Sequence, residues 1–395
     1  MEFFNRKGYK LNKRTVCVVI TARPSYSRIK AALKAINEHQ DLELKIILAG
    51  SSLLEKYGRV DKVIKNDGFT VTEKIYNTIE GETVANMAKT TGVAIMELST
   101  VFYNLKPSMV ITIADRFETI ATSIAASYQN IPLAHIQGGE VTGNIDEKVR
   151  HANTKLADIH LVASEDAKQR VLKMGENPDY VINTGCPSMD LAKEILEDSA
   201  FDFDPLVKYG GVGSKINWRD GYLVVMQHPV TTEYGKSKEH IEVTLNAINE
   251  LGIPTFWFWP NVDAGSDNIS KGIRIFREKY RLTHIHFFKN MEPNDFLRLI
   301  KNSKCLIGNS SVGIRESTFL GVPVVNIGTR QQGRQRAINV IDCDYDKNMI
   351  KKSINMHLSQ KGYGSEFIYG NGTAGRNIAD VLSTIDLIFR KKITY

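Results

Sequence analysis

The sequence nowhere contains the roughly 18 consecutive apolar residues that a membrane span requires. Residues 1–12 are polar and contain no apolar stretch typical of a secretion signal, so we expect a cytoplasmic protein with no membrane partner. Cysteine is scarce, and Cys17, Cys186, Cys305 and Cys343 show no Cys-x-x-Cys spacing. They indicate free thiols in a reducing compartment rather than a disulfide framework or a cysteine zinc site.

Strong charge of one sign is also missing. The formal net charge is +7 over 395 residues, and no block of Lys and Arg alternates with aromatic residues, so nucleic acid is not an expected partner. The small excess suits a nucleotide diphosphate, although a solvated basic surface explains it equally well. No Walker A or Gly-x-Gly-x-x-Gly motif follows a predicted strand, and residues 210–215 are interpreted as a flexible loop. His284 and His286 have no third ligand in sight, so no metal and no redox cofactor is predicted.

What the chain does contain is an alternation of short apolar runs and helix-length amphipathic segments. Repeated β-α-β units predict parallel sheets covered by helices, and 395 residues suit two domains. The fold class is therefore α/β, with two doubly wound domains separated by a polar stretch at about 198–220. Strands are predicted at 16–21, 42–48, 109–113, 131–136, 159–163 and 180–183, then at 222–226, 255–259, 284–288, 305–307 and 323–327, with helices at 116–128 and 146–156 among others.

Polar residues follow several of these strands, where doubly wound sheets bind their ligands. Arg23 and Ser25 follow the first strand, at a turn whose backbone N–H groups favour an anion. A surface Arg beside a helix-capping Ser fits that position equally well.

Three carboxylates, Asp115, Glu140 and Asp146, follow strands of the first half, and Arg116 and Arg150 lie close to them in sequence. Acids beside cations are what proton transfer requires, because one group must accept a proton and another must donate one. Any one of the three acids fits a helix cap, but the set together favours chemistry.

The segment 307–316 is the best phosphate-site candidate in the second half. An apolar run ends in small residues that open a helix, so backbone N–H groups and the hydroxyls of Ser310 and Ser311 could surround a diphosphate. Glu316 could accept hydrogen bonds from ribose hydroxyls. His228 follows another strand and could donate to a diphosphate oxygen, although a lone His is more often structural.

In their order and spacing these pieces resemble the UDP-N-acetylglucosamine 2-epimerases, specifically the hydrolysing branch that feeds sialic-acid synthesis. The resemblance runs from about Arg14 to Ile385. Its landmarks are the Arg23 turn and residues 115–117, 138–140, 146, 150–151, 154–156, 185–188, 227–229, 263–266, 308–311, 328–331 and 368–372.

The resemblance implies the glycosyltransferase-B architecture, in which two Rossmann-like domains face each other across a cleft. We expect these domains at 1–190 and 191–372, with a C-terminal helix at about 373–395 packing back on the first. The resemblance also implies a UDP-sugar substrate, no cofactor, and a homodimer or homotetramer. It assigns His228, Ser310, Ser311 and Glu316 to diphosphate and ribose, Arg23 with Ser25, Arg116 and Arg330 to the nucleotide side, and Asp115, Glu140, Asp146 and Arg150 to the sugar.

One departure from the family pattern matters. Many members have a Glu where this chain has Gln137, and an amide cannot act as a general base. Glu140 therefore becomes the preferred partner of Asp115. The family's reaction, as the resemblance implies it, eliminates UDP to give a 2-acetamidoglucal, and water then adds at C1.

Three other interpretations remain open. The substrate could be a UDP-2,4-diacetamido-trideoxyhexose on the path to legionaminic acid, because the same elimination would serve. A glycosyltransferase of the same fold would need only one base, which the cluster of acids argues against. A non-catalytic sugar-nucleotide sensor is the third, and Gln137 keeps it open.

Overall fold

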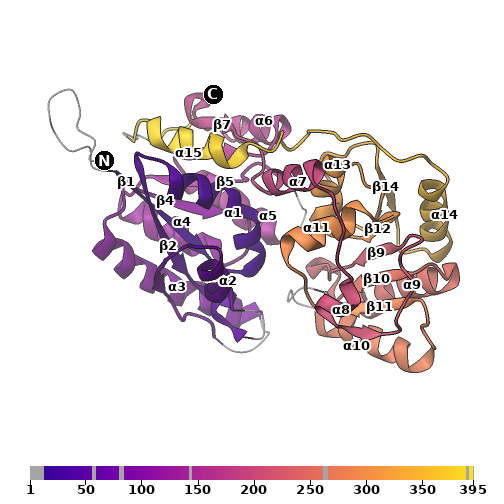
Figure 1. Ribbon diagram of the computed structural model, residues 1–395. Coiled ribbons are helices and arrows are strands. Elements are labelled where there is room, and N and C mark those ends of the chain that lie inside the picture. Colours follow the sequence, from indigo (N-terminus) through magenta and orange to yellow (C-terminus); the bar gives the residue numbers. More distant parts are fainter. Residues whose placement is uncertain are drawn as a thin grey trace. The chain divides into compact units, whose positions relative to one another are not determined.

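The computed structural model describes residues 13–55, 59–79, 84–141, 145–260, 266–387 and 391–394 (Figure 1). The chain divides into two compact units. Unit 1 comprises 1–140, 145–190 and 370–395, and unit 2 comprises 141–144 and 191–369. The landmark at 263–265 and part of the expected C-terminal helix, 388–390, lie outside the described residues.

Unit 1 is built on a seven-stranded, all-parallel sheet in the order β3-β2-β1-β4-β5-β6-β7. Its strands are β1 (Arg14–Ile20), β2 (Leu42–Leu48), β3 (Val71–Lys74), β4 (Met109–Ile113), β5 (Leu133–Ile136), β6 (Ile159–Val162) and β7 (Val181–Asn183). Its helices are α1 (Arg23–Glu38), η1 (Gly50–Leu53), α2 (Val60–Asn66), α3 (Val84–Leu105), α4 (Thr119–Tyr128), α5 (Ile145–Leu156), α6 (Glu165–Lys173), η3 (Pro178–Tyr180), α7 (Ser188–Glu197) and α15 (Ala374–Thr384), although α7 runs on into unit 2.

Both faces of this sheet are buried, as the apolar runs predict. Along β1, Val16, Val18 and Ile20 join one core cluster, whereas Cys17 and Val19 join another on the opposite face. Side chains alternate across a strand, so a continuous apolar run signals helices on both sides.

Helix α15 returns the end of the chain to unit 1 and lies beside α1 (Figure 1). Its Ile378 and Leu382 belong to the same core cluster as Val16. Asp190 caps its first turn by accepting from the backbone N–H groups of Ala374 and Gly375 at 2.8 and 2.7 Å. The first unit is thus completed only by residues that follow the second unit in sequence.

Unit 2 repeats the arrangement in the order β14-β13-β12-β9-β10-β11-β8, parallel except for β8. Its strands are β8 (Val212–Gly213), β9 (Leu223–Met226), β10 (Thr255–Phe258), β11 (Ile285–Phe288), β12 (Cys305–Gly308), β13 (Val324–Ile327) and β14 (Val340–Cys343). Its helices are α8 (Pro205–Tyr209), η4 (Thr231–Lys236), α9 (Ser237–Leu251), α10 (Ser266–Lys279), α11 (Pro293–Lys301), α12 (Ser311–Ile314), α13 (Glu316–Leu320) and α14 (Lys347–Leu358).

Two sequence expectations were wrong here. Residues 210–215 are not simply a flexible loop, because β8 pairs antiparallel with β11 at the edge of the sheet, where both nitrogens of His286 contact backbone carbonyls of Gly210 and Ser214. The helix expected at 116–128 begins only at Thr119, because Ala114 adopts a left-handed φ of 56° and a turn follows it.

Candidate functional site

Arg150 is the centre of a charged cluster in unit 1. It projects from α5, is 1% exposed, and donates through Nη2 to the Asp115 carboxylate and through Nη1 to the Glu140 backbone carbonyl at 2.8 Å. Burial opposes its charge, but the carboxylates of Asp115, Glu140 and Asp146 outweigh burial and raise the pKa of the guanidinium. A buried cation therefore holds three acids from separate segments in one electrostatic cluster.

The backbone explains why these groups meet. Asp115 follows β4 and Glu140 follows β5, which is the neighbouring strand of the sheet. Asp146 and Arg150 lie four residues apart on α5, so their side chains share one helix face. All four residues that the sequence predicted for the reacting sugar are thus brought together.

Arg116 lies in the same turn as Asp115 but is held differently. Its guanidinium donates to both carboxylate oxygens of Glu118, at 3.2 and 3.3 Å. Glu118 is 3% exposed, and its pairing with Arg116 was not predicted, because the only local signal was an opposite charge two positions away. Arg23 opens α1, and Ser25 is buried in the first turn of that helix, so both lie after β1 as expected.

Gln137 also lies at the end of β5, with a positive φ of 65° and 1% exposure. Its Nε2 donates to Sγ of Cys186 at 2.8 Å. The amide is therefore a fixed donor toward a buried thiol, and its Oε1 has no hydrogen-bond partner among the described residues.

In unit 2, Asn309 joins the ends of neighbouring strands. Its side-chain amide accepts from the backbone N–H of His228 at 2.7 Å and donates to the carbonyl of His228 at 2.9 Å. The Asn309 carbonyl in turn accepts from Arg330 at 3.2 Å and from Gln331 at 2.9 Å. His228 and Arg330 are thus tied to the loop that follows β12.

A close strand approach forms the base of this loop. Gly308 has a φ of 128°, and a Cβ there would lie 2.0 Å from the Met226 carbonyl oxygen. Only glycine fits such a position. This glycine was the sequence signal for a special loop, but the role of Asn309 depends on His228, 81 positions away, and gave no local signal.

The loop predicted to open a helix after β12 does so, but the helix is short. Ser310 caps α12 by accepting from the Val312 N–H at 3.4 Å, and α12 ends after four residues at Ile314. A helix this short contributes little dipole. Positive charge comes instead from Arg315, which is 2% exposed and donates to the Ser311 hydroxyl at 3.1 Å.

Glu316 follows as the first residue of α13 and is 7% exposed. Its Oε2 lies 4.0 Å from Nε of Arg315 and has no hydrogen-bond partner among the described residues. Burying an acceptor of this kind without a hydrogen bond reduces the stability of the fold, unless a ligand donates to it.

Unit 2 contains a pocket of about 740 Å³, and one of its lining residues, Thr329, precedes Arg330 in sequence. The other lining residues include Glu233, Lys236, His240, Asp344 and Tyr345. His240 stacks on Tyr345 with ring centroids 3.6 Å apart. Thr329 donates to Glu233 at 2.5 Å. The sequence did not predict this pocket, since its walls come from three distant segments.

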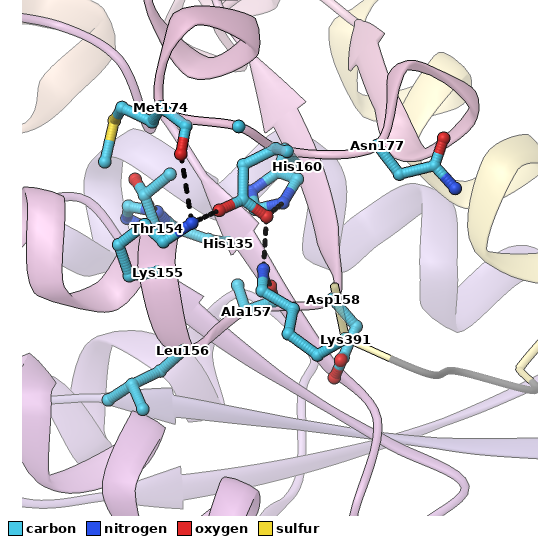
Figure 2. A network of polar contacts seen from close by, with 12 residues as sticks. His135, Thr154, Lys155, Leu156, Ala157, Asp158, His160, Met174, Asn177 and Lys391 are labelled. Atoms are coloured by element: carbon cyan, nitrogen blue, oxygen red, sulfur yellow. Dashed lines mark hydrogen bonds and ion pairs between the residues drawn. The ribbon is translucent and has the colours of Figure 1, made fainter. Parts of the chain in front are cut away.

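A second ionic network is buried in unit 1. Lys155, at the end of α5, donates to Glu176 at 2.5 Å, His160 contacts the same carboxylate at 3.0 Å, and Lys391 from the C-terminal segment pairs with it as well (Figure 2). Glu176 is 2% exposed, and although burial alone would raise its pKa, the three donors lower it to about 2. The C-terminal segment is thereby anchored to the helix that carries Arg150.

Within the described ranges, no three His, Cys, Asp or Glu side chains are arranged to hold a metal. Nor is any helix in those ranges long and apolar enough to cross a bilayer.

The chain is similar to known proteins over nearly its whole length. The family model for UDP-N-acetylglucosamine 2-epimerase matches residues 34–383. The UDP-N-acetylglucosamine 2-epimerase of Neisseria meningitidis serogroup B is 30% identical over 374 residues, covering 94% of this chain and 95% of the relative. The hydrolysing UDP-N,N'-diacetylbacillosamine 2-epimerase of Legionella pneumophila is 30% identical over 383 residues, covering 95% and 97%. The Methanocaldococcus jannaschii UDP-GlcNAc 2-epimerase, solved with UDP-GlcNAc and UDP, shares the fold with a TM-score of 0.77 at 16% identity, covering 93% of this chain and 99% of that one.

Proposed function

This chain belongs to the UDP-N-acetylglucosamine 2-epimerase family, and from that membership we propose that it hydrolyses and epimerises UDP-N-acetylglucosamine, releasing N-acetylmannosamine and UDP for sialic-acid synthesis. The observation that carries the proposal is the Arg150 cluster. Asp115, Glu140 and Asp146 surround one buried guanidinium, which is the acid–base equipment that a proton transfer at carbon needs.

The reaction has to remove a proton from C2 that is barely acidic, because no carbonyl lies beside it. In the proposed route the C2 proton is lost as the C1–O bond to UDP breaks, which gives a 2-acetamidoglucal. Water then adds to C1, and a proton is delivered to the opposite face of C2. The route needs a base, an acid and positive charge for the departing diphosphate.

We assign the proton transfers to Asp115 and Glu140. Asp115 is paired with Arg150, and its carboxylate would serve as the base. Asp146 shares the field of the same guanidinium and tunes the pair. Gln137 takes no proton-transfer role, because its side chain is an amide that already donates a hydrogen bond to the Cys186 thiol.

We assign UDP to unit 2. Arg315, Arg330 and the hydroxyls of Ser310 and Ser311 would stabilise the diphosphate, together with His228. The buried Oε2 of Glu316 would accept from the ribose hydroxyls. We also assign Arg23, Ser25 and Arg116 to substrate binding, as the family resemblance implies.

A second substrate has support of its own. The Legionella relative, named for UDP-N,N'-diacetylbacillosamine, is as similar as the Neisseria one, at 30% identity each. The chemistry at C1 and C2 would be the same, and only the contacts to C4 and C6 would differ.

Proton NMR of the products decides between the substrates. Purified protein is incubated with each sugar nucleotide separately, with no acceptor present. Release of free N-acetylmannosamine and UDP from UDP-N-acetylglucosamine supports the proposal, and turnover of the 2,4-diacetamido sugar alone moves the protein to the second substrate. UDP binding without turnover of either would contradict the enzyme assignment and leave a sensor or a transferase.

A further inference from the structure

Ala114 separates strand β4 from Asp115 and has an unusual backbone. Its φ is 56°, in the left-handed region that residues with a Cβ rarely occupy. The residue is 5% exposed. Because Asp115 comes directly after this bend, the conformation of Ala114 sets the direction in which the Asp115 side chain leaves the sheet.

Groups from two other elements hold this bend in place. The Ala114 carbonyl accepts from Nε2 of His135 on β5 at 2.9 Å and from Nδ2 of Asn153 on α5 at 3.4 Å. The Ala114 N–H donates to the Ile136 carbonyl at 2.9 Å. The Ala114 carbonyl belongs to the peptide bond between Ala114 and Asp115. The hydrogen bond from His135 therefore holds the plane of that peptide, and with it the backbone from which the Asp115 side chain extends.

The proton on His135 can be placed from its partners. A carbonyl oxygen only accepts, so Nε2 must carry the hydrogen. Nδ1 faces the Thr154 hydroxyl at 3.1 Å, and this hydroxyl also has the Arg150 carbonyl as an acceptor at 3.0 Å. His135 is fully buried, and burial lowers its pKa to about 3. The ring is therefore neutral under working conditions and is a fixed donor, not an acid or a base.

Gly138 packs tightly against the contact between His135 and Thr154. A Cβ at Gly138 would lie 2.9 Å from Nδ1 of His135 and 2.9 Å from Oγ1 of Thr154. Figure 2 shows His135 and Thr154 side by side, next to Lys155 at the end of α5. The segment that leads to Glu140 thus rests on the same His–Thr pair that fixes Ala114.

We propose that His135 is a positioning residue for proton transfer: its Nε2 hydrogen bond holds the Ala114–Asp115 peptide in the left-handed turn that aims the Asp115 carboxylate at Arg150. The proposal rests on the proposed function, since it assigns His135 an effect on the step in which Asp115 takes part. His135 itself touches no reacting atom.

Three variants separate positioning from simple stability. In His135→Gln, the amide nitrogen can take the place of Nε2 and donate to Ala114. In His135→Asn, the amide reaches only the Nδ1 position, near Thr154, and in His135→Leu both hydrogen bonds are lost. We expect kcat to fall by about 100-fold in the Asn and Leu variants, as misplacement of a catalytic group by about 1 Å does, with KM within about twofold of the wild type. The Gln variant should recover most of kcat.

His357 on α14 provides a matched control. It is also buried, with Nε2 on the Val324 carbonyl at 3.0 Å and Nδ1 on the Tyr363 hydroxyl at 2.9 Å. His357→Leu should lower the unfolding midpoint as His135→Leu does, but leave kcat per folded molecule unchanged.

The proposal is overturned if the Gln variant is no better than the Asn variant, or if His135→Leu, like His357→Leu, affects only stability. Should the Leu variant fail to fold, the Gln and Asn variants carry the comparison alone. A wild-type protein without turnover contradicts the proposed function, and the positioning role of His135, which rests on that function, then loses its premise. Active wild-type protein with an unaffected His135→Asn variant contradicts the positioning role only.

Discussion

The Arg150 guanidinium and the Asp115 carboxylate form an ion pair across 35 positions of sequence. The pair connects α5 to the turn after β4, and Arg150 reaches the Glu140 carbonyl from the same helix. Charge, helix position and strand order therefore converge on one place in unit 1, and the roles of the surrounding residues can be tested one by one.

Asp115→Asn should lower kcat by about 10²- to 10⁴-fold, the range expected for loss of a general acid or base. The amide still accepts from Arg150 but cannot take a proton. Initial rates of UDP release, measured with circular dichroism on the same sample, separate lost chemistry from lost folding. Asp204→Asn is the matched control, because Asp204 caps α8 through the Leu206 N–H at 2.8 Å and Asn caps as well as Asp. Near-normal turnover in folded Asp115→Asn would remove Asp115 from the mechanism.

Glu316→Gln should weaken binding of UDP by about 10- to 100-fold, because a hydrogen bond to a charged acceptor contributes about 1.5–3 kcal/mol. The effect should appear in Kd and KM, with kcat changed much less, since the ribose lies away from the reacting carbon. Isothermal titration with UDP gives Kd directly. Glu250→Gln, at a surface carboxylate paired with Lys347 and Lys351, should bind UDP normally. An unchanged Kd in Glu316→Gln would mean that the buried carboxylate serves the fold instead.

Much of this architecture was predictable and some was not. The central strands β4, β5 and β6 are short apolar runs, so local sequence placed them within two residues. Helix α4 was predicted to begin three residues early because Arg116, Phe117 and Glu118 are all compatible with a helix. The left-handed conformation of Ala114 prevents the helix from starting at Arg116, and His135 on the next strand holds that conformation. A contact between distant segments cannot be predicted from the local sequence.

The same reasoning applies to the candidate site. Asp115, Arg116 and Glu140 could be named because each comes soon after a strand, and parallel strands end at one edge of their sheet. Asp146 and Arg150 lie on α5, the helix that follows β5. Asn309 and Glu118 were missed because their importance comes from partners that only the fold supplies. Strand β8 was missed because two residues, one of them glycine, carry too little pattern to detect.

Lys391→Met should reduce the free energy of unfolding by about 1–3 kcal/mol, because the buried Glu176 loses one of its three donors. The remaining two, Lys155 and His160, should keep the protein folded. Chemical denaturation followed by far-UV circular dichroism measures the change. Lys347→Met removes a surface pair with Glu250 of similar length, 2.5 Å, and should change the midpoint far less. Equal effects of the two changes would mean that the C-terminal segment does not anchor unit 1.

The buried His135 also predicts a pH dependence of stability. Its pKa is about 3 in the folded protein and about 6.5 when unfolded, so between these values only the unfolded chain binds the proton. Stability should therefore rise with pH across this window, by about 1.4 kcal/mol per pH unit for one proton. In His135→Gln that contribution disappears, and the unfolding free energy plotted against pH should be shallower by about that slope between pH 4 and 6. Two parallel curves would mean that His135 becomes protonated in the folded protein.

The elimination route itself is tested most directly by running the reaction in heavy water and reading C2 of the released sugar by proton NMR. Because the C2 proton is lost and a solvent proton is delivered to the opposite face, we expect free N-acetylmannosamine carrying one deuterium at C2. Released sugar that retains its original hydrogen at C2 would contradict the glucal intermediate, and with it the proton-transfer roles assigned to Asp115 and Glu140.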